Sequence, residues 1–115
     1  LNFLNYEKLS LLKRDSYLIN TSRGQVIDEK ALIKILSENK ISGAALDVFE
    51  NEPIHFDHEL FNFKNVILTP HIGSATVTAR SKMAEICALD VFSVLSSKIP
   101  SCLVNQNVEK IRPLV

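Results

Sequence analysis

The sequence predicts an α/β fold in which helices cover a parallel sheet, and three observations support this prediction. Short apolar runs at residues 17–21, 41–48 and 66–69 have the length of buried strands. An amphipathic helix pattern lies between the first two runs, which makes a strand–helix–strand unit with a right-handed connection. Each run ends in small or charged polar residues, as expected where the carboxyl ends of parallel strands meet.

Two helices are expected beside the strands. Asn5 is a good N-cap for a short helix that ends at residue 12, and Asp28 is a good N-cap for a second helix that stops near residue 39. The apolar face of the second helix contains Ala31, Leu32, Ile35 and Leu36. These offsets are those of a helix that packs one face on a sheet.

The rest of the chain is predicted to contain a long loop and a long helix. Residues 50–64 show no clear period and are interpreted as a functional loop, with a short helical turn near residues 57–60. A helix over residues 74–95 has an apolar face too broad for the partners in this chain. Because the chain begins with Leu1 rather than Met, we expect it to be a fragment of a longer protein.

The composition is typical of a globular domain and argues against several kinds of partner. Of the 115 residues, 46% are hydrophobic and 23% are charged, and the 13 basic and 13 acidic side chains cancel. Without a basic stripe, nucleic acid is not an expected partner. No apolar stretch approaches the roughly 18 residues that span a bilayer, and no signal peptide is recognisable. We therefore expect no membrane partner and a cytoplasmic location.

The cysteine and histidine spacings do not favour a metal site. Cys87 and Cys102 are far apart and are expected to be reduced thiols. His55 and His58 have a His-x-x-His spacing, but no clear third ligand lies near them in the sequence. No metal is therefore predicted.

Four polar residues lie at or after the ends of the predicted strands and define a candidate site. These are Arg23, Asp47, Glu52 and His71. An arginine holds a carboxylate through two parallel hydrogen bonds, and a histidine beside a carboxylate can protonate a developing alkoxide. Together these groups suit the reduction of a small 2-keto acid, and the hydride would have to come from a nicotinamide cofactor.

Each of these residues also has a simpler structural interpretation. Arg23 fits a solvated turn, Asp47 a turn cap, His71 a structural turn histidine, and Glu50 and Glu52 ordinary loop charges. Their joint occurrence after three consecutive predicted strands favours a shared site.

Three segments in the same order resemble the D-isomer-specific 2-hydroxyacid dehydrogenases. They are residues 19–28 (INTSRGQVID), 43–53 (GAALDVFENEP) and 69–74 (TPHIGS), and the resemblance covers about residues 2–95. It implies that residues 1–73 form the second half of an NAD(P)-binding Rossmann-type domain with a doubly wound parallel sheet. Residues 74–115 would then be a long helix that crosses back to a mostly missing substrate domain, followed by a tail.

The resemblance also implies roles for individual residues. Arg23 matches the arginine that binds the substrate carboxylate, His71 the acid/base, and Glu52, rather than Glu50, its carboxylate partner. The positions implied at the nicotinamide end of NAD or NADP are Thr21, Ser22, Arg23, Asp47, His71, Gly73 and Ser74. The implied enzyme is an NAD(P)-dependent oxidoreductase that makes a D-2-hydroxy acid, and complete relatives are expected to be homodimers.

The segment after the histidine resembles one branch of the family. Ser74, Ala75 and Thr76, with Arg80 and Met83, are similar to glyoxylate and hydroxypyruvate reductases. The resemblance leaves open which 2-keto acid is the substrate and whether NAD or NADP is used.

The family's glycine fingerprint for the cofactor pyrophosphate is absent. The chain has only Gly24, Gly43 and Gly73, which do not have the Gly-x-Gly-x-x-Gly spacing. We therefore expect the isolated chain to contact only the nicotinamide end of the cofactor and to be inactive alone. Two alternatives stay open: a nucleotide-sensing regulator or corepressor, whose relatives carry an aromatic residue after the histidine, and an inert product of a truncated gene.

Overall fold

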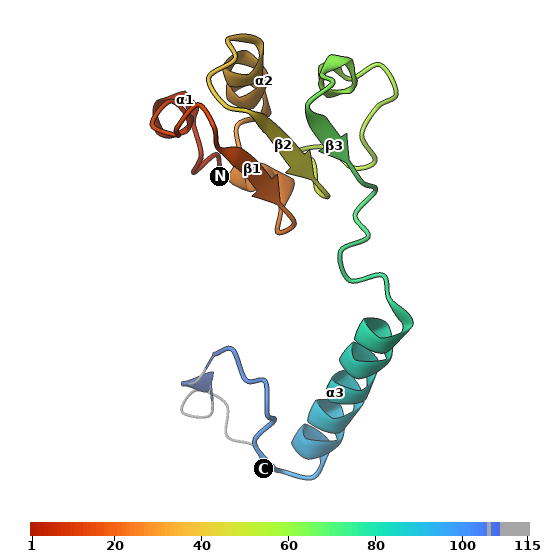
Figure 1. Ribbon diagram of the computed structural model, residues 1–115. Coiled ribbons are helices and arrows are strands. Elements are labelled where there is room, and N and C mark those ends of the chain that lie inside the picture. Colours follow the sequence, from red (N-terminus) through yellow and green to blue (C-terminus); the bar gives the residue numbers. More distant parts are fainter. Residues whose placement is uncertain (106, 109–115) are drawn as a thin grey trace. The chain divides into compact units, whose positions relative to one another are not determined.

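The computed structural model describes residues 1–105, 107 and 108 of the chain. The chain divides into two compact units, Leu1–Gly73 and Ser74–Val115 (Figure 1). The first unit contains the sheet and the candidate site, and the second contains the long helix. Each unit is described by itself.

The first unit is built on a parallel sheet of three strands in the order β1-β2-β3 (Figure 1). The strands are β1 (Tyr17–Asn20), β2 (Gly43–Leu46) and β3 (Val66–Leu68). The predicted α/β class and parallel sheet are thus confirmed. β2 is shorter than the predicted range 41–48, although Ile41 and Val48 are buried as an internal strand requires.

Two helices of the first unit begin at the predicted caps. α1 (Tyr6–Leu9) follows Asn5, whose side chain accepts from the Lys8 N–H at 3.1 Å. It ends before residue 12. The N–H groups of Leu11 and Leu12 instead bond the carbonyls three positions earlier, as in a 3-10 turn. α2 (Glu29–Ser37) follows Asp28, whose side chain accepts from the Ala31 N–H at 3.0 Å.

Two single-turn helices complete the first unit. The first, η1 (Gly24–Val26), follows β1, and the second, η2 (Glu59–Asn62), lies close to the predicted helical turn at residues 57–60. Both belong to the connections that leave the carboxyl ends of β1 and β2. They shape the loops that carry the candidate site residues.

One face of the sheet packs on the helices and the other is exposed. Because side chains alternate along a strand, residues two apart share a face. The buried face and the helices form one hydrophobic core, which includes Leu9, Ala31, Leu32, Ile35, Leu36, Ala44, Leu46 and Leu60. On the opposite face Tyr17, Ile19 and Ile67 are 70%, 69% and 67% exposed. This open apolar face has the character of an interface rather than of ordinary surface.

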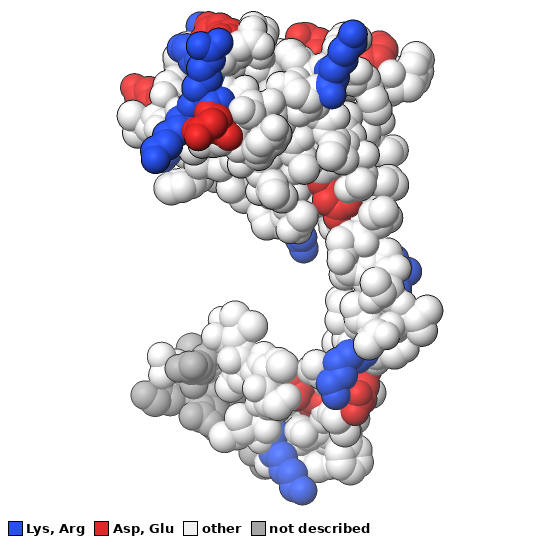
Figure 2. Space-filling view, in the orientation of Figure 1, with Lys and Arg blue, Asp and Glu red and all other residues white. Residues whose placement is uncertain are grey.

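A polar network joins α1 to the end of α2. The Tyr6 hydroxyl donates to Glu38 at 2.9 Å, and the Lys40 ammonium donates to the Tyr6 oxygen at 2.7 Å. Hydrogen bonding to Lys40 and then Tyr6 lowers the pKa of Glu38. Figure 2 shows basic and acidic side chains interspersed over these helices. Exposed pairs of this kind contribute little to the stability of the fold.

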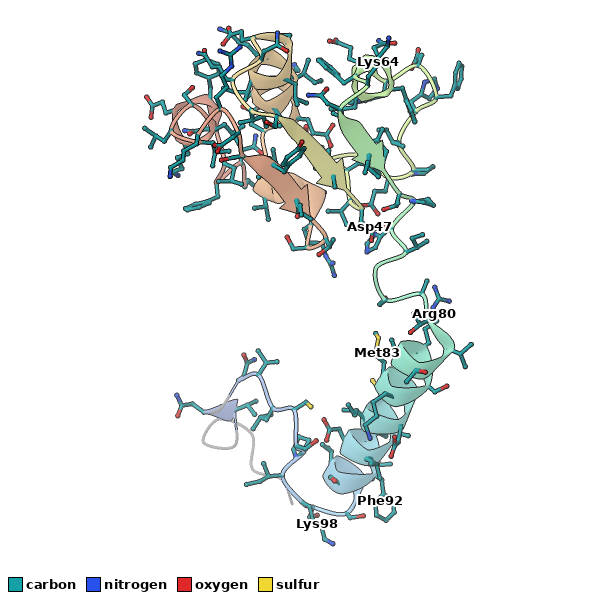
Figure 3. The ribbon with its side chains drawn as sticks, viewed as in Figure 1. Asp47, Lys64, Arg80, Met83, Phe92 and Lys98 are labelled. Atoms are coloured by element: carbon teal, nitrogen blue, oxygen red, sulfur yellow. The ribbon has the colours of Figure 1, made fainter. Side chains whose placement is uncertain are left out.

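The second unit contains α3 (Val77–Leu95), labelled at Met83 and Phe92 in Figure 3. It begins three residues later than predicted, because the Thr76 hydroxyl oxygen caps it by accepting from the Ala79 N–H at 3.1 Å. At its end the Lys98 N–H bonds the Ser93 carbonyl at 2.8 Å, in a closed terminal turn. In the described part of the chain, neither α3 nor any other helix has the length and apolar character needed to cross a membrane.

The core predicts the effect of truncating Leu32, which is fully buried between α2 and the sheet. Replacing it by Ala removes apolar contacts and leaves a cavity, so we expect Leu32→Ala to lower the free energy of unfolding by roughly 2–5 kcal/mol. Urea denaturation of the chain measures this. The matched control is Leu11→Ala, because Leu11 is 84% exposed and its loss leaves no cavity. Equal effects of the two changes would contradict this description of the core.

Candidate active site

The turn after β1 presents Arg23 and is held by Asn20, the last residue of the strand. The buried Asn20 side chain donates to the Arg23 carbonyl at 3.0 Å. Its oxygen accepts from the Ser22 N–H at 3.1 Å and the Ser22 hydroxyl at 2.9 Å. Sequence reasoning missed this role, although a polar residue that ends an apolar run was a usable signal. Thr21 and Ser22 therefore lie with exposed Arg23 in one ordered turn.

Gly24 brings this turn against the loop after β2. A Cβ atom on Gly24 would lie 1.9 Å from both the carbonyl carbon and the carbonyl oxygen of Phe49. Only glycine fits at this close approach of two backbones. The glycine thus keeps the arginine turn beside the loop that carries Glu52.

Asp47 lies just after β2 and binds the segment that follows β3. Its Oδ1 accepts from the Thr69 hydroxyl at 2.5 Å and the Ile72 N–H at 2.8 Å, and its Oδ2 accepts from the Gly73 N–H at 2.7 Å. The Thr69 hydroxyl, followed by the Ile72 N–H, lowers the pKa of Asp47. In Figure 3 Asp47 is labelled at one end of the sheet and Lys64 at the other end. The structure thus gives Asp47 the turn-fixing role that was one of its two interpretations.

Glu52 and His71 form a direct pair. His71 Nδ1 lies 2.7 Å from Glu52 Oε2, and Glu52 Oε1 accepts from the Phe49 N–H at 3.0 Å. The hydrogen bond to His71, followed by that from Phe49, lowers the pKa of Glu52. His71 has a φ of 54°, the left-handed conformation, in which histidine is enriched. With Nδ1 engaged by a carboxylate, Nε2 of this half-exposed ring is the nitrogen available to a ligand.

A cavity of about 430 Å³ adjoins this pair. Its lining consists of Phe49, Glu52, Pro53, Ile54, Pro70 and His71. The histidine and the carboxylate thus stand at the edge of a mostly apolar hollow, as is common for sites that bind small molecules.

The remaining predicted residues are less closely joined. Arg23 contributes to the low pKa of Glu52 through its charge, as the smallest of the causes. Gly73 is bound to Asp47 through its N–H, whereas Ser74 belongs to the second unit. The structure therefore joins Glu52 to His71, and Asp47 to the loop that carries His71.

The His-x-x-His pair does not form a shared site. The His55 ring contacts Asp57, and the His58 ring contacts Glu29. Over the described ranges, the structure shows no group of three or more His, Cys, Asp or Glu side chains that is able to hold a metal ion. The two rings thus bind different carboxylates.

The fold and site together define a class of protein. A parallel sheet with helices, whose strands carry polar groups at their carboxyl ends, is the framework of a nucleotide-binding α/β domain. The histidine–carboxylate pair adds a group suited to acid/base chemistry. Comparison with known proteins agrees: residues 1–73 match the model of the D-isomer specific 2-hydroxyacid dehydrogenase, NAD binding domain. The chain belongs to the D-isomer specific 2-hydroxyacid dehydrogenase family.

Individual relatives extend the similarity into the second unit. The chain is 51% identical over 113 residues to a glyoxylate reductase from Thermofilum pendens, and the match covers 98% of this chain and 33% of the relative. It is 52% identical over 109 residues to a glyoxylate reductase from Pyrococcus furiosus, and this match covers 95% of this chain and 32% of the relative. The chain thus spans about one third of the length of these curated relatives.

A solved structure shows the same fold. It is the NADPH-dependent glyoxylate/hydroxypyruvate reductase from Sinorhizobium meliloti in complex with NADP and malonate. Its sequence is 40% identical, the TM-score is 0.77, and the match covers 84% of this chain and 30% of that one. The predicted family and Rossmann-type fold are therefore confirmed.

The low pKa of Asp47 predicts a pH dependence of stability. A carboxyl whose pKa is lower in the folded state contributes stability above its ordinary pKa of 3.8 and loses it as the pH falls through the folded value. We expect Asp47→Asn to destabilise the chain at neutral pH and to flatten the loss of stability in acid. Urea unfolding measured from neutral pH to pH values below 3.8 tests this.

The matched control is Asp15→Asn, in the exposed turn before β1. The Asp15→Asn chain should lose stability at low pH just as the unmodified chain does. If the Asp47→Asn chain also lost stability at low pH as the unmodified chain does, the role given to this carboxylate would be contradicted.

Proposed function

We propose that the whole protein reduces a small 2-keto acid to the D-2-hydroxy acid, with a nicotinamide nucleotide as the hydride donor. The observation that carries the proposal is the 2.7 Å contact between His71 Nδ1 and Glu52 Oε2. It supplies an oriented proton donor at the carboxyl ends of the strands, where α/β sheets bind their ligands. The names of the relatives favour glyoxylate or hydroxypyruvate as the substrate.

The pair suits proton transfer to the substrate oxygen. The low pKa of Glu52 keeps its carboxylate ionised, so that it accepts a hydrogen bond from Nδ1–H of His71. This fixes the ring orientation and leaves Nε2 to carry the transferred proton. As hydride reaches the keto carbon, His71 gives its proton to the developing alkoxide.

Arg23 is proposed to bind the substrate carboxylate. Its guanidinium is exposed on a turn that Asn20 and Gly24 hold in place. A guanidinium binds a carboxylate through two parallel hydrogen bonds, which fixes the direction of the substrate as well as its position. The complex of the Sinorhizobium meliloti reductase with malonate, itself a carboxylate, supports an anion-binding site in this fold.

The nicotinamide end of NAD or NADP is proposed to lie near Thr21, Ser22, Asp47, Gly73 and Ser74. Asp47 orders the backbone beside this place through its bonds to Ile72 and Gly73. The cofactor supplies the hydride, which no protein side chain can deliver. The matching domain model is described as NAD binding and the Sinorhizobium meliloti reductase binds NADP, so a nicotinamide nucleotide is supported by both.

We further propose that residues 1–73 are the second half of the cofactor-binding domain and that residues 74–115 belong to the crossover helix and tail of the substrate domain. The open apolar face of the sheet supports the first assignment, because doubly wound sheets carry helices on both faces. The exposed apolar side chains of α3, such as Met83 and Phe92, support the second. A homodimer is proposed for the whole protein.

The proton-donor role predicts a large loss of turnover for His71→Ala. Removal of a general acid lowers kcat by roughly 10²-fold or more, because no other group supplies the proton in the right place. Steady-state oxidation of NADH or NADPH by glyoxylate or hydroxypyruvate measures this in the whole protein. The control is His55→Ala, an exposed loop histidine paired with Asp57, which should retain normal kcat. Unchanged turnover in His71→Ala would contradict the role of His71 as the proton donor.

The carboxylate-binding role predicts a specific defect for Arg23→Lys. Lysine keeps the charge but cannot form the paired hydrogen bonds, so we expect kcat/KM to fall roughly 10- to 100-fold. The same change at Arg14, in the exposed turn before β1, serves as the control and should have no effect. An Arg23→Lys protein with normal kcat/KM for every 2-keto acid tested would exclude this role.

A further inference from the structure

Glu29 is a buried carboxylate to which the proposed chemistry assigns no role. It is the first residue of α2, and 8% of its surface is exposed. Its Oε1 accepts from the Glu50 N–H, and its Oε2 lies 3.2 Å from His58 Nε2. The amino end of a helix stabilises an ionised carboxylate through the helix dipole. Glu29 is therefore well suited to hold both the Glu50 N–H and the His58 ring.

The proton positions on His58 follow from its other partner. The Leu60 N–H donates to His58 Nδ1 at 3.3 Å, so Nδ1 is the acceptor nitrogen. In the neutral ring Nε2 then carries the hydrogen. The Nε2 atom of His58 is thus the nitrogen that faces the Glu29 carboxylate, 3.2 Å from its Oε2.

These two contacts of Glu29 flank Glu52 in the sequence. Glu50 lies two residues before it and His58 six residues after it, so one carboxylate on α2 anchors both sides of the loop. The loop is also tied at its start by Gln25, whose side-chain amide donates to the Glu50 carbonyl at 3.1 Å. The position of the Glu52 backbone is therefore set from the helix rather than by the loop alone.

We propose that Glu29 and His58 are positioning residues that hold Glu52 against His71. The proposal rests on the function proposed above, because it concerns the same proton donor. Loss of either anchor lets the Glu52 loop shift, so that the imidazole of His71 is no longer fixed toward the substrate. A displacement of about 1 Å at a reacting group can cost roughly 10²-fold in rate.

The decisive variant is Glu29→Gln in the whole protein. Glutamine keeps the size of the side chain, but its amide nitrogen meets one of the two donors and cannot accept from it. We expect kcat to fall roughly 10- to 100-fold, with little change in KM for the 2-keto acid. The pH profile of kcat should also change, because the Glu52–His71 pair is loosened. The control is Glu59→Gln, an exposed glutamate of η2, which should behave as the unmodified protein.

His58 supplies a rescue test. His58→Leu removes the donor to Glu29 and should lower kcat as Glu29→Gln does, whereas His58→Gln keeps an N–H donor and should recover much of the rate. Because both anchors hold one loop, the double change Glu29→Gln with His58→Leu should cost less than the two single effects combined. Equal losses in His58→Leu and His58→Gln would overturn the proposal, as would a normal kcat in Glu29→Gln.

A spectroscopic measurement separates this inference from the proposed function. The ¹⁵N resonances of the His71 ring report which nitrogen carries the proton, and they do not require turnover. We expect these resonances to move in Glu29→Gln and to stay in place in Glu59→Gln. If the unmodified protein reduces no 2-keto acid, the proposed function fails and the resonances alone decide the inference. Resonances that stay in place in Glu29→Gln would refute it.

Discussion

The carboxylate of Asp47 joins the carboxyl ends of β2 and β3. It accepts hydrogen bonds from the Thr69 hydroxyl and from the backbone N–H groups of Ile72 and Gly73. These donors surround His71 in the sequence, so the carboxylate holds the backbone that carries the histidine in its left-handed conformation. The contact between His71 and Glu52 depends on this arrangement, because a shift of the segment after β3 would carry the ring away from the β2 loop.

Buried polar side chains order two further loops in the same way. The buried polar or charged side chains of residues 1–105 are Asn20, Glu29 and Asp47, which are 6%, 8% and 5% exposed. Asn20 orders the arginine turn, Asp47 orders the histidine segment, and Glu29 contacts the loop that carries Glu52. A buried polar group is costly unless it is paired, and each of these is hydrogen-bonded. The stability lost by burying them is offset by bonds that fix the three loops.

Local signals explain which parts of the fold were predictable. Asn5 and Asp28 were identified as helix caps because a cap bonds a residue three positions ahead. The pairing of Glu29 with Glu50, 21 residues apart, has no signature in the sequence. For the same reason the sequence showed His58 only as part of a His-x-x-His spacing that did not favour a metal site, and the contact of its ring with Glu29 was not predicted. From the residues alone the site was predicted only as a set at strand ends, because a sequence contains no distances between loops. The family resemblance added that Glu52 is the partner of His71, and the two side chains are in contact.

A crystal structure of the whole protein with a nicotinamide nucleotide and oxamate, an unreactive analogue of a 2-keto acid, would test the account most directly. We expect the oxamate carboxylate on the guanidinium of Arg23, and its carbonyl oxygen within hydrogen-bond distance of His71 Nε2. Glu52 should still accept from Nδ1 of that ring. Oxamate bound away from Arg23, or a His71 ring turned from the carbonyl oxygen, would contradict the account.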